Sequence, residues 1–475
     1  MSFPTIMPAH VRVRGLVGLL LLFLVIAYLV PRPEAVTPQS WRLAAIFACV
    51  IAGMIIEPLP APALVLLGLT AMVANGTPIR EALGGYAEPS VWLVIVAMLI
   101  ARAMLDTGLA RRIALVFIRV VGRSSLGISY ALLMTDVTLA SGVPSITARS
   151  AGMLLPIARR IAELFDSHPG ETAGRLGTFL VAALYQGSAV ACAMFFTGQV
   201  SNILGANLAG KLVNVEVTWS SWFVAAIVPG LASCAVVPWV VHRLLTPQVI
   251  RTPEAPRFAI SEIRKMGPMS RDEWITLGVF AGVGLLWITS RWHRLDVTFV
   301  AMLGLGVLLL TGTMSWVTVT AERPAWNVFV WYGGLLRMSE LLNATGTTTV
   351  FAEGVGALFT GIPWLVVLVG ILSVYFYSHY AFASITAHVL AMFPPFVVLL
   401  VGIGVPPRLA VYSLLCLANL PAGLTHYGTT TGPILFGVGY VSFTDWWRVG
   451  FLVSLANLAI WFTIGFAWWK ALGFW

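Results

Sequence analysis

The sequence has few charged residues for its length. Asp, Glu, Lys and Arg make up only 10% of the 475 residues, whereas hydrophobic residues make up 59%. Soluble globular proteins carry roughly 25% charged residues, and disordered chains are poor in apolar residues. The composition therefore excludes a cytosolic enzyme, a secreted disulfide scaffold and a disordered chain. It indicates a protein that crosses a membrane many times.

Cysteine and catalytic motifs are also scarce. The four cysteines, Cys49, Cys192, Cys234 and Cys416, are scattered through apolar runs without CxxC spacing. We interpret them as small buried hydrophobes rather than as metal ligands or disulfides. The zinc-protease pattern HExxH and the nucleophile pattern GxSxG are both missing from the sequence. We therefore expect no metal site, no cofactor and no enzymatic activity.

The basic residues indicate an orientation in the membrane rather than a nucleic-acid partner. Lys and Arg number 28 against 19 acidic residues, but they lie in short segments between apolar runs. The densest segments are residues 12–14, 111–123, 159–175 and 251–271. All of them fall on one side if the N-terminus is cytoplasmic, which places the C-terminus in the periplasm. The lack of a transit peptide favours a bacterial source, and hence the inner membrane of a bacterium.

The apolar runs predict an all-α polytopic membrane protein with about eleven transmembrane helices, because a bilayer core needs about 20 apolar residues per helix. The expected crossings cover about residues 13–30, 41–57, 61–76, 91–108, 178–206, 220–243, 272–290, 295–314, 325–342, 408–437 and 448–470.

Two further apolar stretches do not read as single crossings. Residues of about 124–160 and 362–404 are each long enough to enter and leave the membrane, and Pro, Ser and Thr break each stretch near its middle. Irregular backbone at that depth is tolerated only where protein covers it or where it lines a cavity. We therefore predict two re-entrant hairpins, each with a polar tip.

The two hairpins belong to an internal repeat. The segment SITARSAGMLLP begins at Ser145, and SITAHVLAMFPP begins 239 residues later at Ser384. A weaker match at a similar offset pairs Trp41 with Trp274. Each half holds five crossings and one hairpin, so the second half is inverted relative to the first. Inverted repeats with broken helices are typical of secondary transporters.

This symmetry predicts four parts along the chain. Residues 1–40 form the N-terminal cytoplasmic end and the first span, and residues 41–245 form the first inverted repeat with its hairpin at about 124–160. Residues 246–271 form a cytoplasmic loop, and residues 272–475 form the second inverted repeat with its hairpin at about 362–404.

The hairpin tips have the chemistry of an anion site. The first tip carries Ser145 and Thr147, and the second carries Ser384 and Thr386. Half-helix N-termini present free N–H groups and a positive dipole end, and short hydroxyls add donors for a carboxylate. The alternative is that these hydroxyls bond carbonyls of their own helices, as most membrane Ser and Thr do. The repeated motif favours a substrate site.

A basic residue follows each tip. Arg149 lies two residues after Thr147, and His388 lies two residues after Thr386. A cation deep in a membrane protein is costly and usually functional, so we expect both residues to contact the anion. Arg149 could instead reach the membrane interface, and His388 could be neutral and hydrogen-bonded. Asp136 has no obvious partner in the sequence, and His379 is compatible with packing alone.

Each hairpin precedes a span that polar residues and glycine interrupt. Thr197 and Asn202 lie in the first such span, and Thr425 and His426 lie in the second. A stretch of this kind cannot be a plain helix in lipid, so we expect both spans to unwind beside the tips. These four residues are weaker candidates for substrate contacts.

The motifs resemble those of the divalent anion:sodium symporter (DASS) family, in particular its exchanger branch of citrate/succinate, tartrate/succinate and 2-oxoglutarate/malate translocators. The resemblance covers about residue 40 to the C-terminus and is carried by the following segments. They are SVWLVIVAMLIARAMLDTG, PSITARSAGMLLPI, FYSHYAFASITAHVLAMFPPF, LTHYGTTTGPILFGVGYV and WWRVGFLVSLANLAIWFTIGFAWWKALG.

The resemblance implies a homodimer with an elevator mechanism, in which a transport domain carrying both hairpins slides across a dimeric scaffold. It also implies that Ser145, Thr147, Ser384 and Thr386 contact carboxylates. The family's tip motif is Ser-Asn-Thr, and in Na⁺-coupled members the Asn helps to hold sodium. Here Ile146 and Ile385 occupy that position, so a sodium site of the usual pattern is not expected.

We therefore expect an antiporter for C4–C5 dicarboxylates or tricarboxylates. An empty site with a net positive charge from Arg149 would cost about 2.5–3.5 kcal/mol per charge to carry through the bilayer centre. A bound dianion would neutralise it, which gives obligatory exchange. One alternative is a Na⁺- or H⁺-coupled dicarboxylate symporter, and a second is an anion channel. The expected partners are the substrate and the lipid bilayer.

Overall fold

The computed structural model describes residues 9–346, 359 and 361–475, and the helices account for most of this part of the chain. The first half contains these helices: α1 (Ala9–Leu24), α2 (Pro38–Ile56), α3 (Ala61–Ala74), α4 (Ile79–Ala82), α5 (Pro89–Asp106), α6 (Leu109–Val121), α7 (Ser125–Ala140), α8 (Leu155–Leu164), α9 (Gly177–Met194), α10 (Val200–Val213), α11 (Trp219–Leu244) and α12 (Glu254–Met266).

The second half also consists of helices in its described residues. It contains α13 (Arg271–Ile288), α14 (Ser290–His293), α15 (Val297–Leu310), α16 (Trp316–Ala321), α17 (Arg323–Ala344), α19 (Trp364–Tyr377), α20 (Ile385–Gly402), α21 (Pro407–Leu417), α22 (Gly432–Gly437), α23 (Phe443–Ile460) and α24 (Phe466–Ala471). Residues 1–8 of the predicted N-terminal cytoplasmic end lie outside the described residues.

The predicted all-helical membrane fold is confirmed. Each of the eleven stretches expected to cross the membrane contains helix in the described residues. Eight helical segments are long and apolar enough to span a bilayer, and two of these, Trp364–Ala381 and Ile385–Gly402, are the arms of the second predicted hairpin. The expected breaks are present as well, since residues 195–199 separate α9 from α10 and residues 418–431 separate α21 from α22.

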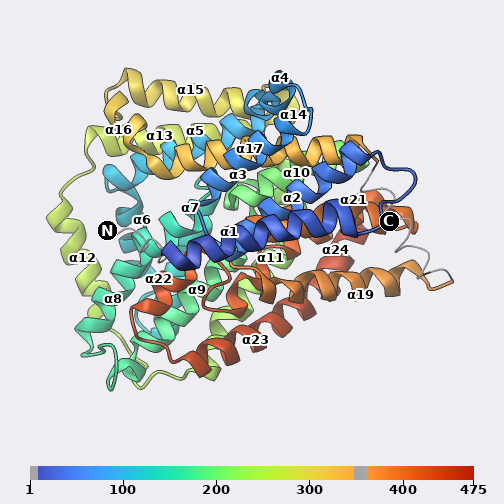
Figure 1. Cartoon of the computed structure of the whole chain (residues 1–475). Helices are drawn as coiled ribbons and strands as arrows, with labels where there is room; N and C mark the ends of the chain where they lie inside the picture. Colours follow the sequence, from blue (N-terminus) through green and yellow to red (C-terminus); the bar gives the residue numbers. More distant parts are fainter. Residues whose placement is uncertain (1–8, 347–358, 360) are drawn as a thin grey trace.

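The two hairpins lie at opposite ends of the bundle. The first is formed by α7 and α8, and the second by α19 and α20. Figure 1 shows α8 beside α12 at one end of the molecule, whereas α19 begins at the other end, where the chain also finishes. The hairpins therefore point toward each other along the bundle. α20 of the second hairpin packs against α10 of the first half.

The ends of these helices follow from local capping residues. Ser124 caps α7 by accepting a hydrogen bond from the Gly127 amide, and Ser384 caps α20 by accepting one from the Ala387 amide. Each cap satisfies an amide that has no partner within its helix. Serine therefore caps the first arm of the first hairpin and the second arm of the second hairpin.

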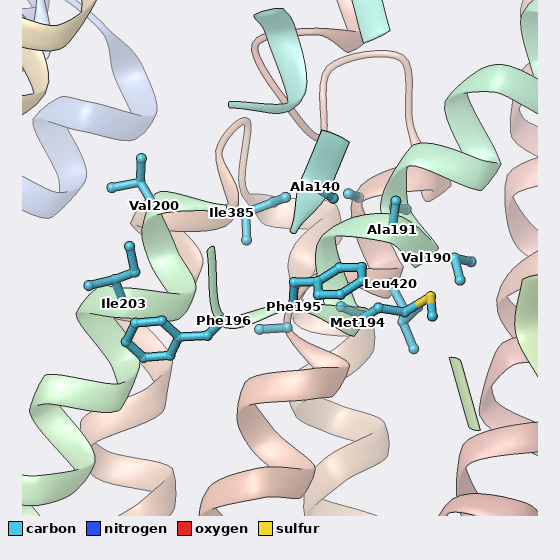
Figure 2. Packing of buried hydrophobic residues seen from close by; sticks show 14 of the residues in the cluster. Ala140, Val190, Ala191, Met194, Phe195, Phe196, Val200, Ile203, Ile385 and Leu420 are labelled. Atoms are coloured by element: carbon cyan, nitrogen blue, oxygen red, sulfur yellow. The ribbon is translucent and has the colours of Figure 1, made fainter. Parts of the chain in front are cut away.

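The interior of the bundle is centred on α9. Of this helix, 94% is buried, and its small residues allow close packing by α7 and α11. Figure 2 shows one part of the core, in which Ala140 at the end of α7 and Ile385 at the start of α20 lie in the same cluster as Phe195 and Leu420 of the two broken spans. Both hairpin tips and both breaks thus meet in one buried region.

Two amphipathic helices occupy segments that the clustered basic residues predicted to be loops. α6 covers most of residues 111–123, and α12 lies within residues 246–271. Both place apolar residues on one face at helical spacing and most of their basic residues on the other. α6 is anchored by Arg112, whose guanidinium pairs with Glu273 at 2.7 Å and donates to the Gly267 carbonyl at 3.0 Å. This pair joins the two halves of the chain.

The Glu273→Gln substitution tests that link. It leaves the mostly buried guanidinium of Arg112 without its counter-charge, so we expect the free energy of unfolding to fall by about 3–5 kcal/mol. Thermal or denaturant unfolding of the purified protein in detergent measures the change. The matched control is Glu262→Gln, because its partner Arg111 has a side chain that is 55% exposed. We expect a loss of only about 0–1 kcal/mol there. Equal losses in both variants would contradict the assignment.

Candidate substrate site

The first hairpin tip is built on a serine cap. Between α7 and a π-helical stretch over Thr147–Leu154, Ser145 accepts a hydrogen bond from the Ala148 amide through its hydroxyl at 3.2 Å. Its carbonyl accepts another bond from the Arg149 amide at 3.1 Å. The hydroxyl proton of Ser145 is then available to donate to an anion, and the helix start adds its positive dipole end.

Thr147 connects this tip to the second half of the chain. Its hydroxyl oxygen lies 3.0 Å from that of Thr430 and 2.8 Å from that of Thr431. Thr430 is exposed, whereas Thr431 is buried. Hydroxyls both donate and accept, so a cluster of three can reorient its protons toward an anion. The sequence did not single out Thr430 or Thr431, although both lie in the quoted GTTTGP segment.

The second tip repeats the same backbone pattern. Ser384 caps α20 through its hydroxyl at 3.5 Å from the Ala387 amide, and its carbonyl accepts from the His388 amide at 3.0 Å. Ile385 and Thr386 are buried, as is Ile146 at the first tip. Among the described residues, no hydrogen bond joins Ser145 or Thr147 to Ser384 or Thr386. The two tips thus share one buried cluster without direct polar contact.

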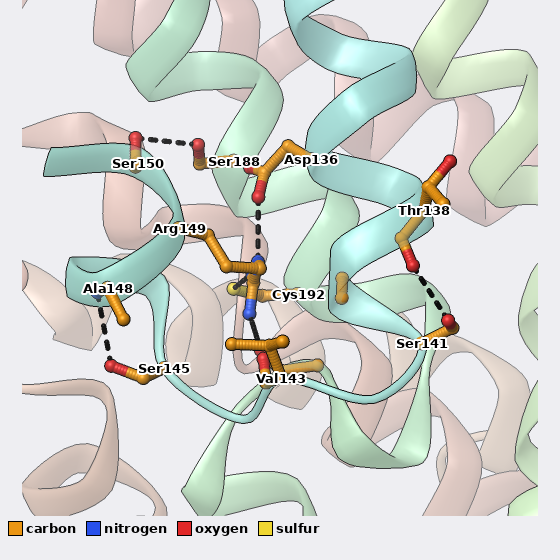
Figure 3. Close-up of polar contacts among 12 residues, drawn as sticks. Asp136, Thr138, Ser141, Val143, Ser145, Ala148, Arg149, Ser150, Ser188 and Cys192 are labelled. Carbon is orange, nitrogen blue, oxygen red and sulfur yellow. Dashed lines mark hydrogen bonds and ion pairs between the residues drawn. The ribbon is translucent and has the colours of Figure 1, made fainter. Parts of the chain in front are cut away.

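Arg149 is held by the protein itself. Its guanidinium is fully buried and pairs with Asp136 at 2.7 Å. It also donates to the carbonyls of Val143 and Gly198, the latter at 2.8 Å, and lies 3.2 Å from the Cys192 sulfur. Figure 3 shows the guanidinium between Asp136 on α7, Val143 in the tip and Cys192 on α9. Arg149 therefore ties the hairpin to the broken span behind it.

This pairing corrects the electrostatic argument made from the sequence. There, Arg149 supplied a net positive charge to the empty site, and Asp136 had no assigned partner. In the structure the two form an ion pair with a formal charge of zero. A buried guanidinium without a counter-ion is very costly, and Asp136 offsets that cost from within the same hairpin. Exchange cannot be derived from a net charge on this residue.

His388 is hydrogen-bonded by the protein itself, as in the alternative that the sequence left open. Its Nε2 lies 2.9 Å from the carbonyl oxygen of Tyr375 and 3.0 Å from the Ser378 hydroxyl. A carbonyl can only accept, so Nε2 carries the proton and donates it. His379 is more than a packing residue, because its Nε2 donates in the same way to the Gly428 carbonyl at 2.9 Å. The two rings lie 5.0 Å apart, centroid to centroid.

The basic residues of the two tips occupy equivalent positions. Arg149 contacts Asp136, which is 13 residues earlier, and His388 contacts Tyr375, which is also 13 residues earlier. Both pairs are separated by the same offset of 239 residues that relates Ser145 to Ser384. The contact between these two positions is therefore present in both halves. It is an ion pair in the first half and a hydrogen bond from an imidazole to a carbonyl in the second.

The broken spans are joined by an asparagine pair, of which the sequence indicated one member. Asn202 donates to the carbonyls of Cys192 and Phe195 at 2.8 and 2.9 Å, which terminate α9. Its own side-chain oxygen accepts from Asn419 at 2.8 Å. Asn419 was not singled out from the sequence. This amide contact ties the broken span of one half to that of the other.

The remaining candidates surround these breaks. Thr197 donates to the Ser141 carbonyl at 2.6 Å and so supports the first tip from behind. Thr425 is fully buried, and its hydroxyl has no hydrogen-bond partner within the described residues. His426 is partly exposed and packs among Tyr427, Phe436, Phe443 and Trp447.

Comparison with known proteins assigns this architecture to a family. Residues 11–475 match the family described as the sodium:sulfate symporter transmembrane region. The chain belongs to this family of transporters, the divalent anion:sodium symporters. It is 40% identical over 457 residues to dicarboxylate transporter 1 of Arabidopsis thaliana chloroplasts, covering 95% of this chain and 82% of that protein. It is 30% identical over 474 residues to the citrate/succinate antiporter of Escherichia coli, covering 95% and 96%.

A solved structure supports the fold alone. The YdaH transporter of Alcanivorax borkumensis aligns over 98% of this chain and 99% of its own length, with a TM-score of 0.55 at 14% sequence identity. Because the matched family and the two relatives above are transporters, this chain is a multi-pass membrane transporter and not an enzyme.

The Asp136→Asn substitution tests the ion pair in this transporter. It keeps the shape of the side chain but leaves Arg149 charged and buried without a counter-ion. We expect a loss of about 3–5 kcal/mol in unfolding free energy and loss of transport. Thermal unfolding in detergent and vesicle transport measure the two effects. Asp106→Asn is the matched control, because the Arg102–Asp106 pair is 42% exposed on both sides. Stability equal to that of the control would contradict the buried pair.

Proposed function

We propose that this chain is a dicarboxylate antiporter of a bacterial inner membrane, which exchanges C4–C5 dicarboxylates or tricarboxylates. The names of its relatives support the substrate class, since these are a chloroplast dicarboxylate transporter and a citrate/succinate antiporter. The hydroxyls and capped helix starts of the two tips support the same class, because they are donors suited to carboxylates.

Ser145, Thr147, Ser384 and Thr386 are the proposed direct contacts of the substrate. Thr430 joins them because it is exposed and contacts Thr147. The protein contacts of Arg149 and His388 point to a different role, in which they position the tips. Ile146 and Ile385 are buried and would contribute shape without polar contacts.

The single observation that carries exchange without sodium is the hydrogen bonding of the carbonyls at the first tip and at the two breaks. Arg149 donates to Val143 in the first tip and to Gly198 in the first break, and His379 donates to Gly428 in the second break. Carbonyls at such breaks coordinate Na⁺ in many secondary transporters. Here the chain's own N–H groups bond them, and the isoleucines remove the side-chain oxygen. We therefore propose that the first tip and both breaks are ordered without a metal ion.

The mechanism and assembly follow from the family resemblance. We propose a homodimeric elevator in which both hairpins and the broken spans move together across a scaffold. Cross-bonds such as Asn202 to Asn419 support movement as one body, because they join the two broken spans. The basic segments at one end of the molecule support a cytoplasmic N-terminus and a periplasmic C-terminus.

Uptake into proteoliposomes distinguishes the antiporter from its alternatives. We expect labelled succinate or malate to enter vesicles preloaded with unlabelled dicarboxylate, at a rate that an inward Na⁺ or H⁺ gradient does not change. Empty vesicles should accumulate little label. Entry into empty vesicles that requires Na⁺ or H⁺ would establish a symporter, and gradient-independent entry into empty vesicles would establish a channel. Either result would overturn exchange.

The tip hydroxyls are tested by Thr147→Val and Thr386→Val, which keep the shape and remove the hydroxyl. A hydrogen bond to a charged group contributes about 1.5–3 kcal/mol, so each variant should raise the substrate KM by about tenfold or more. Thr70→Val is the matched control, because Thr70 is exposed and bonds the Leu66 carbonyl of its own helix. Unchanged KM values in both tip variants would remove the tips from the site.

A further inference from the structure

A cleft of about 1000 Å³ opens at the end of the molecule where the chain finishes. It lies between the start of α11, the α14–α15 connection, the start of α21 and the C-terminal residues. Four charged residues line it: Arg294, Arg408, Glu216 and Asp296. None of them takes part in the hairpin tips, and the proposed transport site does not account for them.

The charged residues of this cleft differ in whether other groups of the protein bond them. Asp296 caps α15, and its carboxylate accepts from the amides of Thr298 and Phe299 at 2.8 and 3.0 Å. Arg294 and Arg408 are both exposed, and within the described residues neither has a carboxylate within 4.0 Å. A guanidinium binds carboxylates through two parallel hydrogen bonds. Two of them in one cleft provide a partner for each end of a dicarboxylate, opposed by the carboxylates of Glu216 and Asp296.

The inner wall of the cleft is connected to the first hairpin. Phe196 and Trp219 line the cleft, and Phe196 belongs to the break between α9 and α10. The indole of Trp219 donates to the Thr197 hydroxyl at 3.1 Å, which donates in turn to the Ser141 carbonyl at the tip. Only two side chains therefore separate the cleft from the backbone of the tip.

We infer that this cleft is a capture site for dicarboxylate anions, distinct from the transport site, in which Arg294 and Arg408 bind the substrate before it reaches the hairpin tips. The inference rests on the proposed function for the identity of the ligand. Because the two arginines are solvent-exposed, their attraction should fall as salt is added. The four formal charges of the cleft sum to zero, so the proposed capture rests on direct pairing with the two guanidiniums and not on a net positive cleft.

The test uses the R294Q/R408Q double variant of the full-length protein in right-side-out and inside-out membrane vesicles. We expect the KM for succinate to rise by about three- to tenfold on the membrane face that carries the cleft, with the maximal rate and the KM on the other face unchanged. The difference from wild type should shrink at high ionic strength. R264Q is the matched control, because Arg264 is exposed on α12 at the opposite end.

A second variant gives an effect of opposite sign. Glu216→Gln removes the opposing charge, so it should lower the same KM on the same face. A structural role for these residues would not produce opposite shifts in KM at a constant maximal rate. Wild-type KM values in the double variant, or equal shifts on both faces, would overturn the capture site while leaving dicarboxylate exchange in place. If the wild-type protein moves no dicarboxylate, the capture site and the proposed function both fail.

Discussion

Broken helices inside a membrane leave carbonyl groups without helical partners, and the rest of this structure depends on how those carbonyls are hydrogen-bonded. No water in the hydrocarbon region replaces a lost bond, so each unsatisfied group costs several kcal/mol. Here the partners are buried side chains. Asn202 bonds the carbonyls that end α9, and Arg149 bonds those of Val143 and Gly198. The polar residues near the tips are therefore structural requirements before they are functional ones.

The same constraint makes each half of the chain dependent on the other. The second break, between α21 and α22, is bonded by residues of α9 in the first half. Tyr185 donates to the Ala422 carbonyl and Gln186 to that of Gly423, each at 2.8 Å. Gln186 lies so close that a Cβ at Gly423 would meet its side-chain oxygen at 2.2 Å. Glycine is required at position 423 because the side-chain amide of Gln186 must approach its backbone closely. This contact connects the break to a residue of α9 that is 237 positions away.

Sequence patterns predicted the features that depend on local chemistry. The length of apolar runs gives the crossings, and the repeated SxTA motif gives two serine-capped helix starts at the tips. The α6 and α12 helices were not predicted, because their many basic residues lower the mean hydropathy, although an apolar face recurs at helical spacing. The hydrogen-bond partners of the two breaks were not predicted for another reason. No spacing rule relates Tyr185 to Ala422 or Asn202 to Asn419, since only the packing of two halves brings them together.

The ion pair of Arg149 with Asp136 was not predicted from the sequence either. It changes the explanation of why the transport of one dianion is coupled to that of another. With an ion pair of zero formal charge at the first tip, Arg149 gives the empty site no net charge. A bound dianion is then held by N–H groups and hydroxyls, which orient toward it without cancelling its charge. Moving two charges through a membrane potential of 100 mV costs about 4.6 kcal/mol, at about 2.3 kcal/mol per charge. The return of a second dianion in the same cycle offsets that cost. In the proposed exchanger, electroneutrality is therefore a property of the whole cycle, and the tips need only to bind anions and stay ordered without a metal ion.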